Sequence, residues 1–274
     1  MMYELAPVID IYLHVLVLLT GACIGSFLNV CIVRIPLEQS TVRPASHCPT
    51  CQQPIAWYDN IPVASYIALR GRCRRCGTRI SPRYALVETL TAALFFAIWL
   101  KYGWSAETPV YWLVVSGLIL GTFVDFEHMI IPDRVSLGGM LAGVILSTAF
   151  PVIHGASAPL DGLLASGIGL AIGAGSLWLV AVLGKLAFKK DAMGLGDVKL
   201  LGAIGAFMGW QGVLFTVMIS SLAGSLVGLF LVFGQRREWQ SRIPYGPYLA
   251  LAAVIWLLWG QEWWQAYIQW MSGI

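Results

Sequence analysis

Two aspartates in this sequence stand where charged residues are costly. Asp125 follows a long apolar run, and Asp197 precedes another within the segment Met193-Gly-Leu-Gly-Asp-Val-Lys199. Charged side chains at the edge of hydrocarbon are unfavourable and usually mark a functional site. Paired carboxylates can share the activation of water, one accepting its proton while the other, protonated, donates to a carbonyl oxygen. We therefore predict that Asp125 and Asp197 form one catalytic site.

The residues beside Asp197 support this site in different ways. Gly194 and Gly196 allow backbone conformations that other residues avoid and let a peptide approach closely. Lys199 has two equally good interpretations, because it could offset the charge of the acids or extend its ammonium group to a membrane interface. The alternative for Asp197 itself is a helix N-cap, although capping does not explain the flanking glycines.

Two further acids have simpler interpretations. Pro132 and Asp133 open an apolar run, and Asp133 there is best explained as the N-cap of a helix, in support of the site. Glu88 lies just inside another run, where it could be an interfacial charge paired with an arginine such as Arg83.

Four cysteines have the spacing of a metal site. They form two C-x2-C pairs, Cys48 with Cys51 and Cys73 with Cys76. This pattern is typical of tetrahedral zinc bound by four thiolates, with reduced free thiols as the alternative. Because all four ligands would be protein sulfur, we expect the zinc to be structural, stabilising a loop that has few apolar residues of its own.

The composition indicates how these sites are held. The chain has 274 residues, of which 58% are hydrophobic and 11% are charged, and its mean hydropathy is +0.75. Such a chain lacks the polar residues to cover a soluble domain, so we predict an all-α polytopic membrane protein embedded in a lipid bilayer. The net charge of +3 comes from basic residues concentrated in a few loops, which indicates membrane orientation and not binding of nucleic acid.

Apolar runs predict about eight transmembrane helices. They lie at about 11–33, 84–100, 110–125, 134–150, 162–184, 198–211, 213–233 and 247–260, and the boundary within 198–233 could instead be a tilted pair or a broken helix. We divide the chain into a first span at 1–36, a cysteine-containing loop domain at 37–83 and a transmembrane core with both aspartates at 84–274.

Loop charges predict which side each span faces. The first loop is rich in arginine, and the later basic loops carry Lys185, Lys189, Lys190, Arg236, Arg237 and Arg242. By the positive-inside rule the first loop, which is the zinc-knuckle loop with the four cysteines, and the later basic loops are cytoplasmic, and both termini are outside. Asp125 and Asp197 then both lie at the cytoplasmic membrane face.

Five segments in order carry a resemblance to a known family. They are Gly25-Ser-Phe-Leu-Asn-Val30 with Arg34-Ile-Pro36; the cysteine pairs with Ile55–Pro62 and Leu69–Cys73; Asp125 followed by Pro132-Asp133; Gly194-Leu-Gly-Asp197-Val-Lys199; and Ile243-Pro-Tyr-Gly-Pro-Tyr248. The chain resembles the bifunctional prepilin leader peptidases, which are G-x-G-D membrane aspartic proteases. The tetrapeptide alone is a weak signal, whereas five ordered matches are specific.

The resemblance implies an activity and its participants. It assigns the catalytic roles to Asp125 and Asp197, and it implies type IV prepilins and type II secretion pseudopilins as substrates, cleaved after a glycine at the bacterial inner membrane. It also implies N-methylation of the new terminus with S-adenosylmethionine, in a region that includes the cysteine loop and a weak candidate for cofactor binding, Glu88. The sequence has no glycine-rich Rossmann fingerprint, so methyl transfer rests on the resemblance alone. No sequence feature indicates an oligomeric state.

Two other classes of membrane protein compete with this prediction. Presenilin-like proteases share G-x-G-D but generally lack the cysteine pairs and the Pro-Asp after the first acid. A proton-coupled transporter could use two acids as a relay, but such sites usually lie near the membrane midplane, whereas these acids are at one face.

Overall fold

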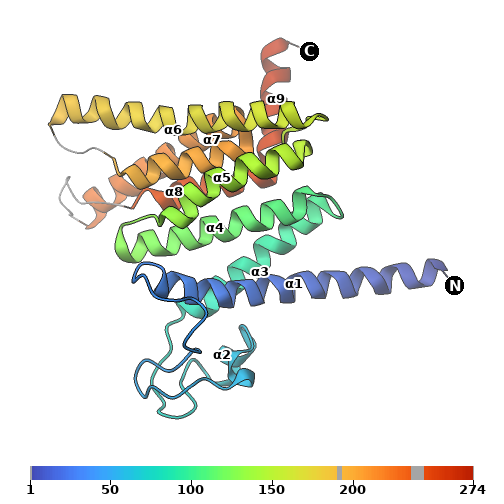
Figure 1. The fold of residues 1–274 in the computed structure, drawn as a ribbon, viewed down its shortest axis with the longest axis vertical. Helices are drawn as coiled ribbons and strands as arrows, with labels where there is room; N and C mark the ends of the chain where they lie inside the picture. The colour runs from blue at the N-terminus through green and yellow to red at the C-terminus, as the bar shows by residue number, and fades with distance from the viewer. Residues whose placement is uncertain (1, 190–192, 236–243, 274) are drawn as a thin grey trace. The chain divides into compact units, whose positions relative to one another are not determined.

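A computed structural model describes residues 2–189, 193–235 and 244–273 (Figure 1). The described residues form helices and no β-strand, which confirms the predicted all-α class. The basic residues Lys190, Arg236, Arg237 and Arg242 and the motif residue Ile243 lie outside the described residues. The chain divides into two compact units, Met1–Trp104 and Ser105–Ile274.

The first unit contains two long helices joined by the cysteine-containing loop. Helix α1 (Met2–Arg34) packs against α3 (Arg83–Tyr102), and the loop between them carries the short helices η1 (Trp57–Asn60) and α2 (Ala64–Ala68). A Cβ atom on Gly21 or Gly25 would lie 2.7 Å from the Cα atom of Ala92 or Glu88, respectively. Glycines four residues apart thus let the two helix backbones meet closely, as in other membrane helix pairs.

The second unit holds the remaining helices. These are α4 (Glu107–His128), α5 (Asp133–Ala149), η2 (Pro151–His154), α6 (Pro159–Phe188), α7 (Leu195–Gln235), α8 (Gly246–Ile255), the π-helical turn η3 (Trp256–Gly260) and α9 (Gln261–Ser272). Helix α7 packs against α5, α6 and α8, and α4 packs against α5 and α8. Asp125 near the end of α4 and Asp197 in the first turn of α7 therefore belong to one bundle.

Helix α7 is interrupted at Gly209, which has φ 68° and ψ −178°. A Cβ atom on Gly205 would lie 2.8 Å from Cγ2 of Val213. In a continuous helix these residues would be about 12 Å apart along the axis, because each residue rises 1.5 Å. The chain therefore turns sharply at Gly209, as predicted for a pair of segments within 198–233.

Small residues line the contacts of the first segment of α7. Backbone atoms of Gly205 leave no room for a side chain on Gly169 of α6, and a Cβ on Gly143 of α5 would lie 2.6 Å from that of Ala206. Such contacts bring the backbones of α5, α6 and α7 close together.

A polar cluster lies beside the interruption in α7. His154 Nε2 is 2.9 Å from Ser147 Oγ, which in turn donates to the carbonyl oxygen of Ala206 at 3.0 Å. Helix interruptions leave carbonyl groups without helical partners, and this hydrogen bond satisfies one of them. The structure thus places His154 at the turn of α7. Burial lowers the pKa of the His154 imidazole.

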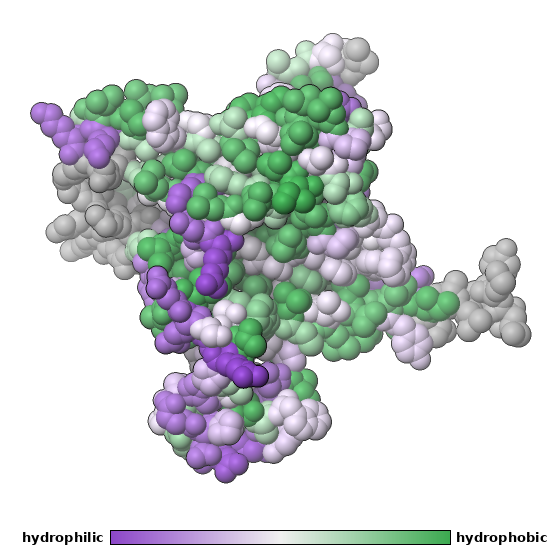
Figure 2. Space-filling model, viewed as in Figure 1, coloured by the Kyte–Doolittle hydropathy of each residue, from purple (hydrophilic) through white to green (hydrophobic). Residues whose placement is uncertain are grey.

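Five described helices are long and apolar enough to cross a membrane, namely α1, α3, α4, α6 and α7. Helix α5 has only 17 residues. Hydrophobic side chains cover much of the visible surface over the helices of the second unit, whereas the cysteine loop is mostly hydrophilic (Figure 2). A long apolar surface of this kind is suited to lipid.

Candidate functional site

Asp125 is held at the C-terminal end of α4. Its side chain is 5% exposed, and Oδ2 accepts a hydrogen bond from the backbone N–H of Gly246 at 3.1 Å. Gly246 is the first residue of α8, where backbone N–H groups lack helical partners. The free N–H at the start of one helix therefore fixes the carboxylate at the end of another.

Asp197 lies in the first turn of α7 and is half-buried. Its backbone N–H bonds to the carbonyl of Gly194, and its carboxylate lies within hydrogen-bonding reach of the Gly194 backbone. Asp125 is close enough to interact electrostatically with Asp197. The fold thus brings together the two carboxylates that the sequence predicted to be paired. Since α7 begins at Leu195, Asp197 is inside the helix, and the alternative that it is the N-cap is wrong.

Two glycines and one isoleucine shape the space around the acids. A Cβ on Gly246 would lie 2.8 Å from Asp125 Oδ2, and one on Gly196 would lie 3.2 Å from Ile131 Cβ. The Cδ1 atom of Ile131 would also lie 3.2 Å from a Cβ on Gly246. Ile131, from the loop before α5, therefore lies against glycines of both α7 and α8. Sequence reasoning had not assigned a site role to Gly246 or Ile131; the only signal was that Gly246 is part of the fifth matched segment.

Lys199 is joined to the start of α5. Its ammonium group lies 2.7 Å from Oδ1 of Asp133. Asp133 is the first residue of α5, the N-cap is Pro132, and no side chain caps the helix, so the predicted capping role of Asp133 is wrong. The pair instead ties α5 to the turn of α7 that carries Asp197.

Glu88 belongs to the first unit. Its side chain is only 8% exposed, and Oε2 accepts a hydrogen bond from the backbone N–H of Val63 at 2.7 Å. The Ser26 side chain is a further partner. These contacts give Glu88 a structural role between the cysteine loop and α3.

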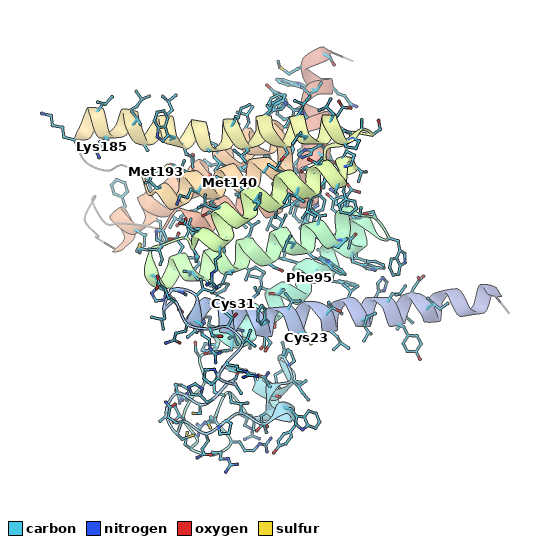
Figure 3. The ribbon with its side chains drawn as sticks, in the orientation of Figure 1. Cys23, Cys31, Phe95, Met140, Lys185 and Met193 are labelled. Carbon is cyan, nitrogen blue, oxygen red and sulfur yellow. The ribbon has the colours of Figure 1, made fainter. Side chains whose placement is uncertain are left out.

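The four predicted metal ligands meet in the loop of the first unit. The Sγ atoms of Cys48, Cys51, Cys73 and Cys76 all lie within 4.8 Å of one another, and those of Cys48 and Cys76 are 3.8 Å apart. Tetrahedral zinc with Zn–S bonds of about 2.3 Å places its sulfur ligands about 3.8 Å apart. The cluster therefore fits one zinc ion. The other cysteines, Cys23 and Cys31, lie along α1 (Figure 3).

Both cysteine pairs are built by the same local backbone pattern. In the first, Cys48 N–H donates to Gln53 O and Gln52 N–H donates to Cys48 O. In the second, Cys73 N–H donates to Thr78 O and Gly77 N–H donates to Cys73 O. Each pair is thus a tight turn that presents two thiols on one side.

The second turn also favours a thiolate. Hydrogen bonds with the Thr78 side chain and backbone lower the pKa of Cys76 to about 6. Because the thiolate is the form that binds a metal, this environment suits a ligand.

Comparisons with known proteins match both units. Residues 19–102 match the bacterial peptidase A24 N-terminal domain, and residues 112–229 match the type IV leader peptidase family. A protein of Myxococcus xanthus named prepilin leader peptidase/N-methyltransferase is 42% identical over 84% of this chain and 65% of its own length. Relatives with the same name in Pseudomonas putida and Neisseria gonorrhoeae are 37% and 32% identical, each over 92% of both chains. No solved structure matches the chain.

Proposed function

Since this chain belongs to the type IV leader peptidase family, we propose that it cleaves the leader peptides of prepilins and N-methylates the new terminus. The relatives' shared name supports both activities. The observation that carries the peptidase assignment is the convergence of Asp125 and Asp197 from α4 and α7 of one unit.

The two acids divide the chemistry of peptide hydrolysis. One carboxylate accepts the proton of an attacking water, while the other, protonated, donates to the carbonyl oxygen of the scissile bond. Gly246 supports this by holding Asp125 in one orientation with its backbone N–H. The absence of a side chain on Gly194 leaves room beside the Asp197 carboxylate for an extended peptide, whereas Gly196 lets Ile131 lie close against α7.

The membrane arrangement that we propose has eight spans. Five helices are long enough alone, the interruption at Gly209 makes two spans of α7, and α5 and the continuous run of α8 with η3 provide the others. The basic loops then favour a cytoplasmic position for the cysteine loop and for both acids at the bacterial inner membrane. In this arrangement the peptidase core lies within residues 84–274.

The loop at 37–83 binds one structural zinc ion through Cys48, Cys51, Cys73 and Cys76. The loop has few buried apolar residues to hold its two turns together. Zinc bound to both cysteine pairs cross-links the turns and stabilises the loop. For S-adenosylmethionine we assign no contact residues, because the described residues contain no sheet with a glycine-rich turn, and Glu88 is engaged by Val63. Pseudopilin substrates and cleavage after a glycine follow from the family resemblance.

The test is cleavage of a prepilin by the full-length protein in detergent. Asp125→Asn and Asp197→Asn should each abolish cleavage, because neither amide can exchange a proton with water as a carboxyl group does. Asp161→Asn, which changes an exposed acid at the start of α6, is the matched control and should cleave normally. Cleavage by either active-site variant at the wild-type rate would rule out the assigned pair. Absence of cleavage by the wild type would rule out the peptidase and favour a transporter.

A further inference from the structure

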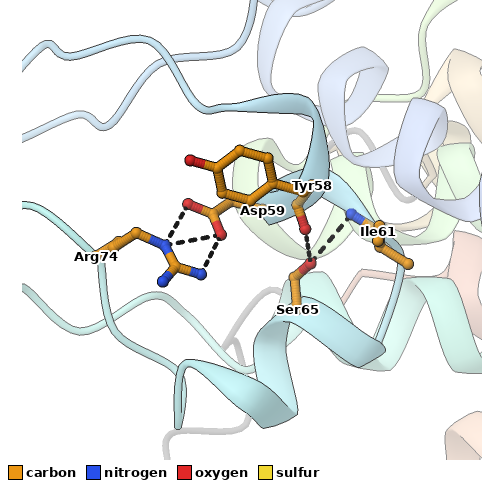
Figure 4. A network of polar contacts seen from close by, with 5 residues as sticks. All are labelled: Tyr58, Asp59, Ile61, Ser65 and Arg74. Atoms are coloured by element: carbon orange, nitrogen blue, oxygen red, sulfur yellow. Dashed lines mark hydrogen bonds and ion pairs between the residues drawn. The ribbon is translucent and has the colours of Figure 1, made fainter.

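The short helices η1 and α2 form one compact part of the cysteine loop. The Ser65 hydroxyl donates to the carbonyl oxygen of Tyr58 at 2.9 Å and accepts from the backbone N–H of Ile61 at 3.1 Å (Figure 4). One side chain therefore fixes the end of η1 against the start of α2. We refer to residues 57–68 as the η1–α2 segment.

This segment exposes large apolar and aromatic side chains. Trp57 is 81% exposed and Ile67 is 69% exposed, and Tyr58 and Ile61 are also exposed. A cluster of such side chains in water is unfavourable and usually marks an interaction surface. Tryptophan and tyrosine are also the residues most enriched at membrane interfaces.

The segment is attached beside a membrane helix and not beyond its end. The N–H of Val63 donates to Glu88 Oε2 at 2.7 Å, and Glu88 lies in the second turn of α3. That position is about 7.5 Å along the axis from the start of α3, since each residue rises 1.5 Å.

Val63 adopts an unusual conformation to make this contact. It has φ 59° and ψ −50°, which is rare for a β-branched residue, and the N–H of Ala64 bonds to Pro62 O across it. The turn directs the Val63 N–H toward the buried carboxylate. The η1–α2 segment is thereby fixed at the depth of the first turns of a spanning helix.

The charges of the loop fit an anionic surface. Asp59 is the one acidic residue between 57 and 68, and both of its carboxylate oxygens accept hydrogen bonds from Arg74 (Figure 4). The Arg74 guanidinium lowers the pKa of the Asp59 carboxyl, so Asp59 stays ionised. Its negative charge is balanced by the positive charge of Arg74. Further arginines are exposed on the same loop, namely Arg70, Arg72, Arg75 and Arg79.

We propose that the η1–α2 segment lies in the headgroup region of an anionic bilayer, with Trp57 and Ile67 against lipid and the loop arginines near phosphate groups. Basic segments next to a membrane helix are attracted to the anionic cytoplasmic leaflet, and aromatic rings are stable at that depth. The segment then holds the cysteine loop at the membrane surface. This inference depends on α3 being a spanning helix and on the cytoplasmic side proposed for the cysteine loop, and not on either enzymatic activity.

Photo-crosslinking tests the proposal on the full-length protein. A photoreactive amino acid is placed at position 57 or 67, with position 53 as the control, because Gln53 is exposed and polar in the same loop. The protein is put in nanodiscs of phosphatidylglycerol and phosphatidylethanolamine with a prepilin added. We expect lipid adducts at 57 and 67 to exceed those at 53 by about fivefold or more. Equal yields at all three positions, or adducts with the prepilin in place of lipid, would overturn the proposal.

A second measurement needs no substitution, so it holds even where a probe disturbs folding. Hydroxyl-radical oxidation of the wild-type protein in the same nanodiscs is read by mass spectrometry for Trp57, Tyr58 and the exposed His47 of the same loop. After correction for intrinsic reactivity, Trp57 and Tyr58 should be protected several-fold relative to His47. Oxidation of Trp57 at the rate expected of a fully hydrated indole would contradict a position in the bilayer.

Discussion

The backbone N–H of Gly246 donates a hydrogen bond to Asp125 Oδ2 at 3.1 Å, although 121 residues separate them in the sequence. The same closeness leaves no room for a side chain, because a Cβ on Gly246 would lie 2.8 Å from that oxygen. The position of the Asp125 carboxylate therefore depends on the start of α8.

Gly246→Ala should displace the Asp125 carboxylate and slow prepilin cleavage. We expect a loss of about tenfold or more, since a shift of about 1 Å at a catalytic group can cost up to about a hundredfold. The rate of cleavage in detergent measures it. Gly224→Ala is the control, because a Cβ there meets the Tyr245 ring at an ordinary 3.8 Å. If both variants cleave at the wild-type rate, the proposed role of Gly246 is wrong.

Gly169→Ala should destabilise the contact between α6 and α7. The added methyl group would overlap the backbone of Gly205, and such overpacking costs about 1–3 kcal/mol. The predicted result is a lower melting temperature in detergent. Gly167→Ala on the same helix is the matched control, because its methyl group would meet no atom within 4 Å. Equal melting temperatures for the two variants would show that α6 and α7 do not meet closely at Gly169.

Replacing Cys48 and Cys51 together by serine should remove bound zinc. Elemental analysis of the purified protein should give about one zinc per wild-type chain and almost none for the variant, since four sulfurs form one closed site. Cys23→Ser changes a cysteine on α1, outside the cluster, and should keep the metal. Wild-type protein that is purified without chelators and contains no metal would contradict the zinc site.

His154 should make folding stability depend on pH. Burial lowers its pKa in the folded protein, whereas the unfolded residue titrates near about 6.5. Below that value the unfolded state binds the proton more readily, so stability should fall as the pH decreases from about 6.5 toward the lowered folded value. The described partners of the ring, Ser147 and the Ala206 carbonyl, are neutral and do not stabilise an imidazolium as a carboxylate would.

The comparison variant is His154→Gln, which retains a polar group but does not titrate. Melting temperatures of wild type and variant are measured in detergent from pH 8 to pH 5. The melting temperature of the variant should rise relative to that of the wild type as the pH falls. A constant difference over this range would mean that His154 does not titrate on unfolding.

The sequence determined the features that depend on short-range patterns. Hydropathy located the five helices that are long and apolar enough to cross a membrane, because a helix crossing hydrocarbon requires one continuous apolar run. The C-x2-C spacing identified all four cysteines of the cluster, because each pair is built within a single tight turn. The apolar surroundings of Asp125 and Asp197 likewise distinguished them from the acids in hydrated loops.

Only the tertiary structure decided which distant residues meet. Nothing local in the sequence indicates that Gly246 binds Asp125, that Lys199 pairs with Asp133, or that Val63 turns its N–H toward Glu88. The predicted capping role of Asp133 was wrong, and the capping alternative for Asp197 is excluded, because a helix start is fixed to one residue by tertiary packing, whereas acidic residues are common throughout a first turn. These contacts depend on how the helices cross. The crossings are set where helix backbones approach closely at glycines, and the residues that meet there lie on different helices, as Gly169 and Gly205 do.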